Sequence, residues 1–114
     1  MRFRSAVIGA TSIIMLATGS ALAMECPEHI AAAEQHVEQV ARDVRGMAGM
    51  MTPEATMWVL SLLDKARLLL DEARTGHESA QNPYDHALAM ANADSALAFA
   101  KVADILHFEA MIDH

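Results

Sequence analysis

The sequence predicts an all-α fold: an antiparallel three-helix bundle with up-down-up connections. After residue 26, apolar residues recur at alternating spacings of three and four, which is the periodicity of helices that pack along one seam. Two start signals, Thr52-Pro53-Glu54 and Asn82-Pro83-Tyr84-Asp85, divide this region into three segments joined by short connections. There is no β-type alternation and no glycine-rich strand-to-helix turn, so the sequence gives no support to a nucleotide-binding α/β fold.

Residues 1–23 have the organisation of a cleaved secretory signal peptide. Arg2 and Arg4 form a basic start, Ala6 to Ala17 is apolar, and Ala21-Leu-Ala23 is a small-x-small cleavage site. The apolar stretch is shorter than the roughly 20 residues that cross a bilayer, so no transmembrane segment is expected. We therefore expect cleavage near Ala23, a periplasmic location and a single domain over residues 24–114.

Cleavage makes the domain strongly acidic. Loss of Arg2 and Arg4 leaves six of the eight basic residues against fifteen acidic ones, a formal charge of −9. This charge repels phosphate backbones and anionic lipids, so we expect neither a nucleic-acid partner nor a membrane surface. A lipid anchor on Cys26 is not expected, because Leu22-Ala-Met-Glu25 lacks the small residues that lipoprotein signals need.

The first helix is expected over about residues 27–50, with Pro27 in its first turn and Glu28 complementing the helix dipole. Gly46 and Gly49 weaken its last turns. Its predicted seam consists of Ile30, Ala33, Val37, Val40, Val44, Met47 and Met51.

The second helix is expected over about residues 53–75 and ends at Arg74-Thr75-Gly76, with a polar loop from His77 to Gln81. Its predicted seam consists of Ala55, Val59, Leu62, Ala66, Leu69 and Ala73. Further apolar residues, with Trp58, Leu60 and Leu63 foremost, widen the stripe to most of the circumference, which is typical of a central helix or a subunit interface.

The third helix is expected over about residues 83–112 and is rich in alanine. Between Ala87 and Ala103, eight of 17 residues are alanine, so the helices can approach closely but bury little side-chain bulk. Cys26 is the single cysteine and no intrachain disulfide is available to stabilise the domain. We therefore expect a homo-oligomer, in the simplest case a dimer that completes the bundle.

Methionine and histidine are the residues that could carry chemistry, with seven methionines and six histidines after residue 23. Thioether and imidazole together favour copper, since methionine sulfur suits Cu(I) and imidazole suits both oxidation states. An up-down-up bundle brings one such group to the end where the first helix turns into the second. This first cluster consists of Met47, Met50, Met51, His107, Met111 and His114. The alternative is that the methionines fill the core and His114 is a frayed terminus.

A second cluster is expected at the opposite end and consists of Cys26, His29, His36, His77 and His86. Cysteine and histidine ligands suit zinc or copper. The alternative is that these histidines are simply solvated. Cys26 precedes Pro27 at the expected helix N-terminus, where the helix dipole would stabilise a thiolate. Three roles stay open for Cys26: a metal ligand, an intermolecular disulfide or a free thiol.

No enzymatic activity is expected. The patterns Ser-x-x-Lys, Gly-x-Ser-x-Gly and His-Glu-x-x-His do not occur, and the carboxylates fall at helical spacing, with Asp64–Arg67 and Asp71–Arg74 as intrahelical pairs. A haem is not expected, because Cys-x-x-Cys-His is missing and three alanine-rich helices leave too little room.

The segment from Leu63 to Arg74, the following Thr-Gly-His77 and the alanine-rich helix through His107 resemble the small metal-binding protein family. The resemblance implies an exported, acidic helical bundle that binds copper and other divalent ions. Members of that family carry a histidine in almost every heptad, whereas this chain has leucine, alanine or aspartate at most of those places. The resemblance therefore implies a role as metal ligand only for His29, His36, His77, His86 and His107.

Two functions follow from these patterns. The first is a periplasmic metal-binding bundle, with copper before zinc or another divalent ion, that acts as a buffer, carrier or resistance protein. The second is a non-enzymatic interaction module, in which helix 53–75 binds a periplasmic partner protein or a second copy of the chain.

Overall fold

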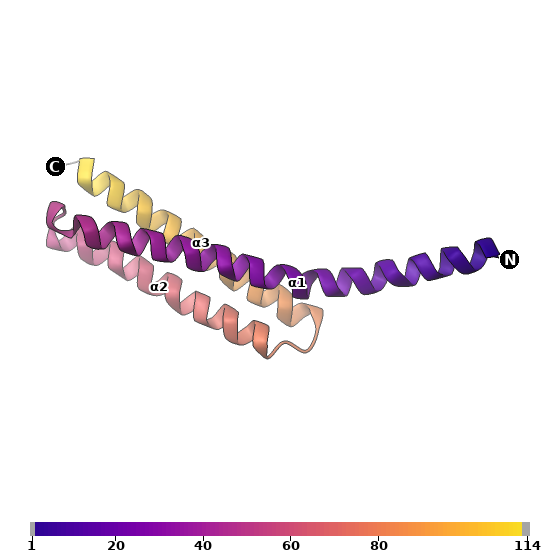
Figure 1. Ribbon diagram of the computed structural model, residues 1–114. Helices are drawn as coiled ribbons and strands as arrows, with labels where there is room; N and C mark the ends of the chain where they lie inside the picture. Colours follow the sequence, from indigo (N-terminus) through magenta and orange to yellow (C-terminus); the bar gives the residue numbers. More distant parts are fainter. Residues whose placement is uncertain (1, 113–114) are drawn as a thin grey trace.

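The structure is a computed structural model that describes the backbone of residues 2–112 and the side chains of residues 23–111 other than Ala48. It contains three α-helices, α1 (Arg2–Met47), α2 (Pro53–Glu78) and α3 (Pro83–Ile112), and a short 3₁₀ helix, η1 (Ala48–Met50). The three helices pack side by side with alternating directions, and no strand occurs in the described backbone (Figure 1). The predicted all-α three-helix bundle is confirmed.

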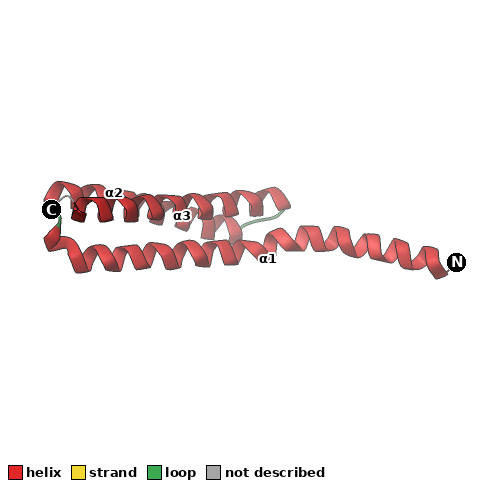
Figure 2. Cartoon of the chain, turned by 90° about the horizontal axis from the view of Figure 1, so that it is seen from above, coloured by secondary structure: helices red, strands yellow, loops and turns green. Residues whose placement is uncertain are grey.

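Helix α1 is much longer than the sequence pattern indicated. It begins at Arg2 rather than near residue 27, so Pro27 lies inside the helix. Its N-terminal half projects beyond the bundle, as Figures 1 and 2 both show, and the molecule measures 75 × 25 × 16 Å. Proline removes one intrahelical hydrogen bond, and here the helix tolerates that loss. Cleavage near Ala23 stays a prediction.

Within the part of the chain that the structure describes, none of the helices contains an apolar stretch of the length that a bilayer crossing requires.

Two clusters of buried side chains form the core, one near each end of the bundle. Helix α3 contributes only alanines to them, at spacings of four and three. The stripe consists of Ala89, Ala93, Ala96, Ala100 and Ala103, all at least 99% buried. Because a methyl group is the whole side chain, α1 and α2 can lie close to the α3 backbone along its length.

The seam of α2 differs in detail from the predicted one. Leu63 and Leu70 are buried, whereas Leu62 and Leu69, one residue earlier in each case, are only half-buried. Both leucines of each pair lie near the buried face, and packing against α1 and α3 selects the second of them. Leu63 was predicted to face a partner, and that prediction was wrong because its side chain is fully buried in the core.

The predicted helix starts at residues 53 and 83 are confirmed by their caps. Thr52 Oγ1 accepts a hydrogen bond of 3.1 Å from the backbone N–H of Ala55. Asn82 Oδ1 accepts one of 2.9 Å from the N–H of Asp85, whose own carboxylate accepts one of 3.1 Å from the N–H of Gln81. These bonds satisfy amide groups that the first turn of a helix leaves free.

The end of α2 was predicted too early. The helix continues through Gly76 and His77 to Glu78, and the N–H of Ser79 donates to the carbonyl oxygen of Thr75 at 3.0 Å. Gly76 has no positive φ, so it is an ordinary helical residue rather than a left-handed cap. The predicted loop from His77 to Gln81 therefore shortens, and His77 lies in the last turn of a helix.

Replacement of Gly76 by alanine tests this helix boundary, because the change in the free energy of unfolding has opposite signs for a helical residue and for a cap. A Cβ at position 76 would lie 3.5 Å from Ala89 Cβ, an ordinary van der Waals contact. Gly76→Ala should therefore raise the free energy of unfolding by about 0.5–1 kcal/mol, the helix-propensity gain of alanine over glycine. Urea unfolding followed by circular dichroism measures the change.

Gly46→Ala is the matched control, since Gly46 is also helical and a Cβ there meets nothing within 4 Å. Both variants should stabilise the protein. Destabilisation by Gly76→Ala alone would show that α2 ends at Gly76.

Candidate metal centre

Cys26, His77 and His86 meet at the end of the bundle where α2 turns into α3. They come from α1, from the last turn of α2 and from the first turns of α3. The Cys26 sulfur and one ring nitrogen of each histidine all lie within 4.8 Å of one another. We call these three residues the loop-end site.

The local sequence explains why both histidines reach this place. Because α2 runs to Glu78, His77 is held by a helix, and His86 follows the Asn82 cap by four residues. The connection between them is held by Ser79, whose hydroxyl donates to the carbonyl oxygen of Thr75 at 2.8 Å. The N–H of His86 donates to the carbonyl oxygen of Asn82 at 3.3 Å. The two imidazoles are thus presented by helical backbone on both sides of a short turn.

The polar atoms of the loop-end site lack strong partners. The Cys26 sulfur lies 3.8 Å from the backbone oxygen of His86, a weak contact for a thiol donor. The imidazole rings of His77 and His86 have centroids 5.3 Å apart and planes inclined by 58°. Nδ1 of each ring is shielded from solvent and has no hydrogen-bond partner among the described residues. A buried polar atom without a partner costs about 1–3 kcal/mol, so a ligand that contacts these nitrogens would recover free energy.

The thiol of Cys26 lies in the core of the bundle. In the full chain α1 begins at Arg2, so Cys26 lies inside the helix, whereas cleavage near Ala23 would place Cys26 in the first turn. Its side chain is fully buried, and burial raises the pKa of the thiol above its usual range. An intermolecular disulfide would require exposure of this sulfur.

The other two histidines of the predicted second cluster do not join the loop-end site. His29 Nδ1 lies 2.7 Å from Asp94 Oδ1, so His29 links α1 to α3 through a carboxylate instead. His36 is half-buried further along α1, and its Nε2 is shielded from solvent without a hydrogen-bond partner among the described residues. The structure therefore brings together three of the five residues of the second cluster.

The first cluster is also brought together in part. Nδ1 of His107 lies 3.4 Å from the sulfur of Met51, and both side chains are buried. Met47 and Met111 line a groove together with His107, although Met47 is exposed rather than part of the core seam. Met50 is exposed. His114 lies outside the described residues.

A groove between α1 and α2 leads from the surface to His77. Its volume is about 320 Å³, and Glu34, Arg74 and Glu78 line it together with His77. Arg74 pairs with Glu34 across the groove and with Asp71 at 3.1 Å, and the hydrogen bond to Glu34 raises the pKa of Arg74. The fixed positive charge beside the site is thus compensated by two carboxylates.

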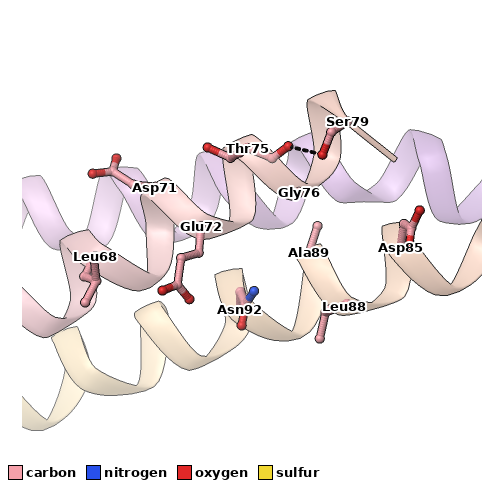
Figure 3. A pocket seen from close by; sticks show the side chains of 10 residues that line it. All are labelled: Leu68, Asp71, Glu72, Thr75, Gly76, Ser79, Asp85, Leu88, Ala89 and Asn92. Carbon is pink, nitrogen blue, oxygen red and sulfur yellow. Dashed lines mark hydrogen bonds between the residues drawn. The ribbon is translucent and has the colours of Figure 1, made fainter. Parts of the chain in front are cut away.

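A second groove, between α2 and α3, carries negative charge next to the same end. Figure 3 shows Glu72 pointing from α2 towards α3 and Ala89 pointing at Gly76, with Asp85 near the loop. Gly76 and Asp85 directly precede His77 and His86 in the chain. None of the side chains that line this groove is a buried metal ligand. Its carboxylates give a negative electrostatic potential near the loop-end site.

The predicted intrahelical pairs are present, with Asp64 and Arg67 at 3.8 Å and Asp71 and Arg74 at 3.1 Å. The pair between Arg74 and Glu34 was missed, because sequence spacing reports on neighbours within one helix only.

Comparisons of the chain with family models, with curated proteins and with solved structures found no match. The resemblance to the small metal-binding protein family stays a prediction.

The burial of Cys26 predicts slow thiol chemistry. Because the sulfur is covered and its pKa is raised, alkylation of the folded protein by iodoacetamide at neutral pH should be at least roughly tenfold slower than after unfolding in urea. Mass spectrometry of the labelled protein measures both rates.

The matched control places the thiol at an exposed helical position, as Ser61→Cys combined with Cys26→Ala. Its alkylation rate should change little on unfolding. Equal rates for folded and unfolded wild-type protein would contradict the buried position of Cys26.

Proposed function

We propose that this protein is a small exported metal-binding bundle that holds one transition-metal ion at Cys26, His77 and His86 and acts as a buffer or carrier in the periplasm. The observation that supports the proposal is the convergence of one thiol and two imidazoles, from three different helices, within 4.8 Å. Reversible binding needs no catalytic group, so the proposed function is not enzymatic.

The donor set suits copper and zinc. Thiolate and imidazole are the ligands that both ions prefer, and copper stands above zinc in the general order of affinity. We therefore place copper first. A metal with sulfur at about 2.3 Å and nitrogen at about 2.0 Å has ligand atoms about 3.3–3.5 Å apart, so the three side chains need to close by up to about 1.5 Å.

The surroundings favour entry of a cation. The chain has a formal charge of −7, and carboxylates lie in both grooves that flank the loop-end site. Binding would supply a partner to the shielded Nδ1 of His77 or His86, provided that this nitrogen is the one that ligates. The thiol must lose its proton on binding, and the raised pKa of Cys26 makes affinity fall as the pH is lowered.

Cobalt titration tests the site, since Co²⁺ takes the place of zinc and gives a sulfur-to-metal charge-transfer band only when a thiolate is bound. The protein should bind one Co²⁺ with such a band. Cys26→Ala should remove the band. His77→Gln or His86→Gln should weaken cobalt binding by at least roughly 100-fold, because loss of a direct ligand costs more than loss of a residue that only hydrogen-bonds to a ligand. An excess of Cu(I) should displace the cobalt.

His29→Gln is the matched control, because His29 lies at the same end but contacts Asp94 instead of the loop-end site. It should bind cobalt as the wild type does. Circular dichroism checks that each variant is folded. The proposal fails if Cys26→Ala retains the band, or if His29→Gln loses as much affinity as His77→Gln.

The second candidate function is the interaction module, which one observation favours. Trp58 is 50% exposed and Leu60 is 41% exposed on α2, so both side chains are accessible to a partner in this fold. In this function α2 binds a second copy of the chain.

Sedimentation of the double variant Trp58→Gln/Leu60→Gln tests the second candidate. The wild-type chain should sediment as a dimer at micromolar concentration and the double variant as a monomer. Leu88→Gln, which alters a residue of similar exposure on α3, is the control and should remain dimeric. A monomeric wild-type protein would eliminate this candidate.

A further inference from the structure

His107 stands out at the opposite end of the bundle. Among the described side chains it is the one polar group buried as deeply as the core, with 7% of its surface exposed. The neighbour of its Nδ1 is the sulfur of Met51, at 3.4 Å, and Met51 itself is 6% exposed. A thioether is a weak acceptor, so this contact offsets little of the cost of burying an imidazole.

The separation of these two atoms matches that of two ligands on one ion. A nitrogen at about 2.0 Å and a sulfur at about 2.3 Å from the same metal, at a near-tetrahedral angle, lie about 3.5 Å apart. The pair therefore already has the spacing that a bound ion requires. It is supplied by two separate segments, the connection before α2 and the last turns of α3.

Access and further ligands come from a groove between α1 and α3. Its volume is about 1040 Å³, and its lining includes His107 with the thioethers Met47 and Met111. The charged residues that face this groove are Arg42, Asp43, Asp104 and Glu109. Three carboxylates against one guanidinium give the groove a negative potential, while the donors next to His107 are sulfur atoms.

We propose that Met51 and His107 form a second metal site, selective for Cu(I), with Met111 as the next ligand. Neutral thioethers bind the soft Cu(I) ion and compete poorly with water for Zn²⁺ or Cu²⁺. The site is independent of the loop-end site, because His107 follows His86 by 21 residues on α3, or about 32 Å at 1.5 Å per residue. It does not rest on the proposed function, and the two can fail separately.

Anaerobic competition titration with a chromophoric Cu(I) chelator tests the second site in the Cys26→Ala background, which removes the thiolate of the loop-end site. This protein should bind one Cu(I) and no Zn²⁺. Addition of Met51→Leu, which nearly conserves volume, should weaken Cu(I) binding by at least roughly tenfold, and addition of His107→Gln should abolish it. Met57→Leu, at an exposed methionine, should leave the affinity unchanged.

A second measurement keeps the test valid if His107→Gln does not fold. In the folded Cys26→Ala protein, Cu(I) should shift the methyl carbon resonances of Met51 and Met111 and leave that of Met57 in place. Absence of Cu(I) binding in the Cys26→Ala protein, or Cu(I) binding that Met51→Leu leaves unchanged, would overturn the proposal.

Discussion

The close packing of three helices along the alanine stripe of α3 is the constraint on which both candidate sites depend. Ala89, Ala93, Ala96, Ala100 and Ala103 present only methyl groups to their neighbours. A Cβ at Gly76 would lie within 3.5 Å of Ala89 Cβ, which shows how near α2 comes to α3 beside the loop. At that separation the short side chains of Cys26, His77 and His86 reach one another. Larger residues in the stripe would move the helices apart and disperse the donors.

The same packing places the polar chemistry at the two ends of the bundle. Between the ends, the fully buried side chains of the described residues are alanine, valine and leucine, which offer no donor atom to an ion. At the ends the core gives way to donors, a thiol with imidazoles at one and thioethers with an imidazole at the other. Carboxylates line the grooves beside both ends. Acidic surroundings and soft donors together favour cations of the copper and zinc type.

Sequence periodicity predicts the helices well and their relative rotation poorly. The caps at Thr52 and Asn82 are local hydrogen bonds, so their residue types predict them directly. The heptad pattern does not decide between Leu62 and Leu63, because both lie near the buried face and packing against α1 and α3 selects Leu63. His29 has the spacing of a metal ligand, yet a carboxylate on α3 holds it. Such choices depend on neighbours that are distant in the sequence.

The central claim is that one thiolate and two imidazoles bind the same ion. X-ray absorption at the zinc edge, on protein loaded with one equivalent of zinc, tests it directly, since the neutral donors of the Met51–His107 site do not retain zinc. The account predicts one sulfur at about 2.3 Å and two imidazole nitrogens at about 2.0 Å from the metal. A spectrum with only nitrogen and oxygen neighbours would contradict it.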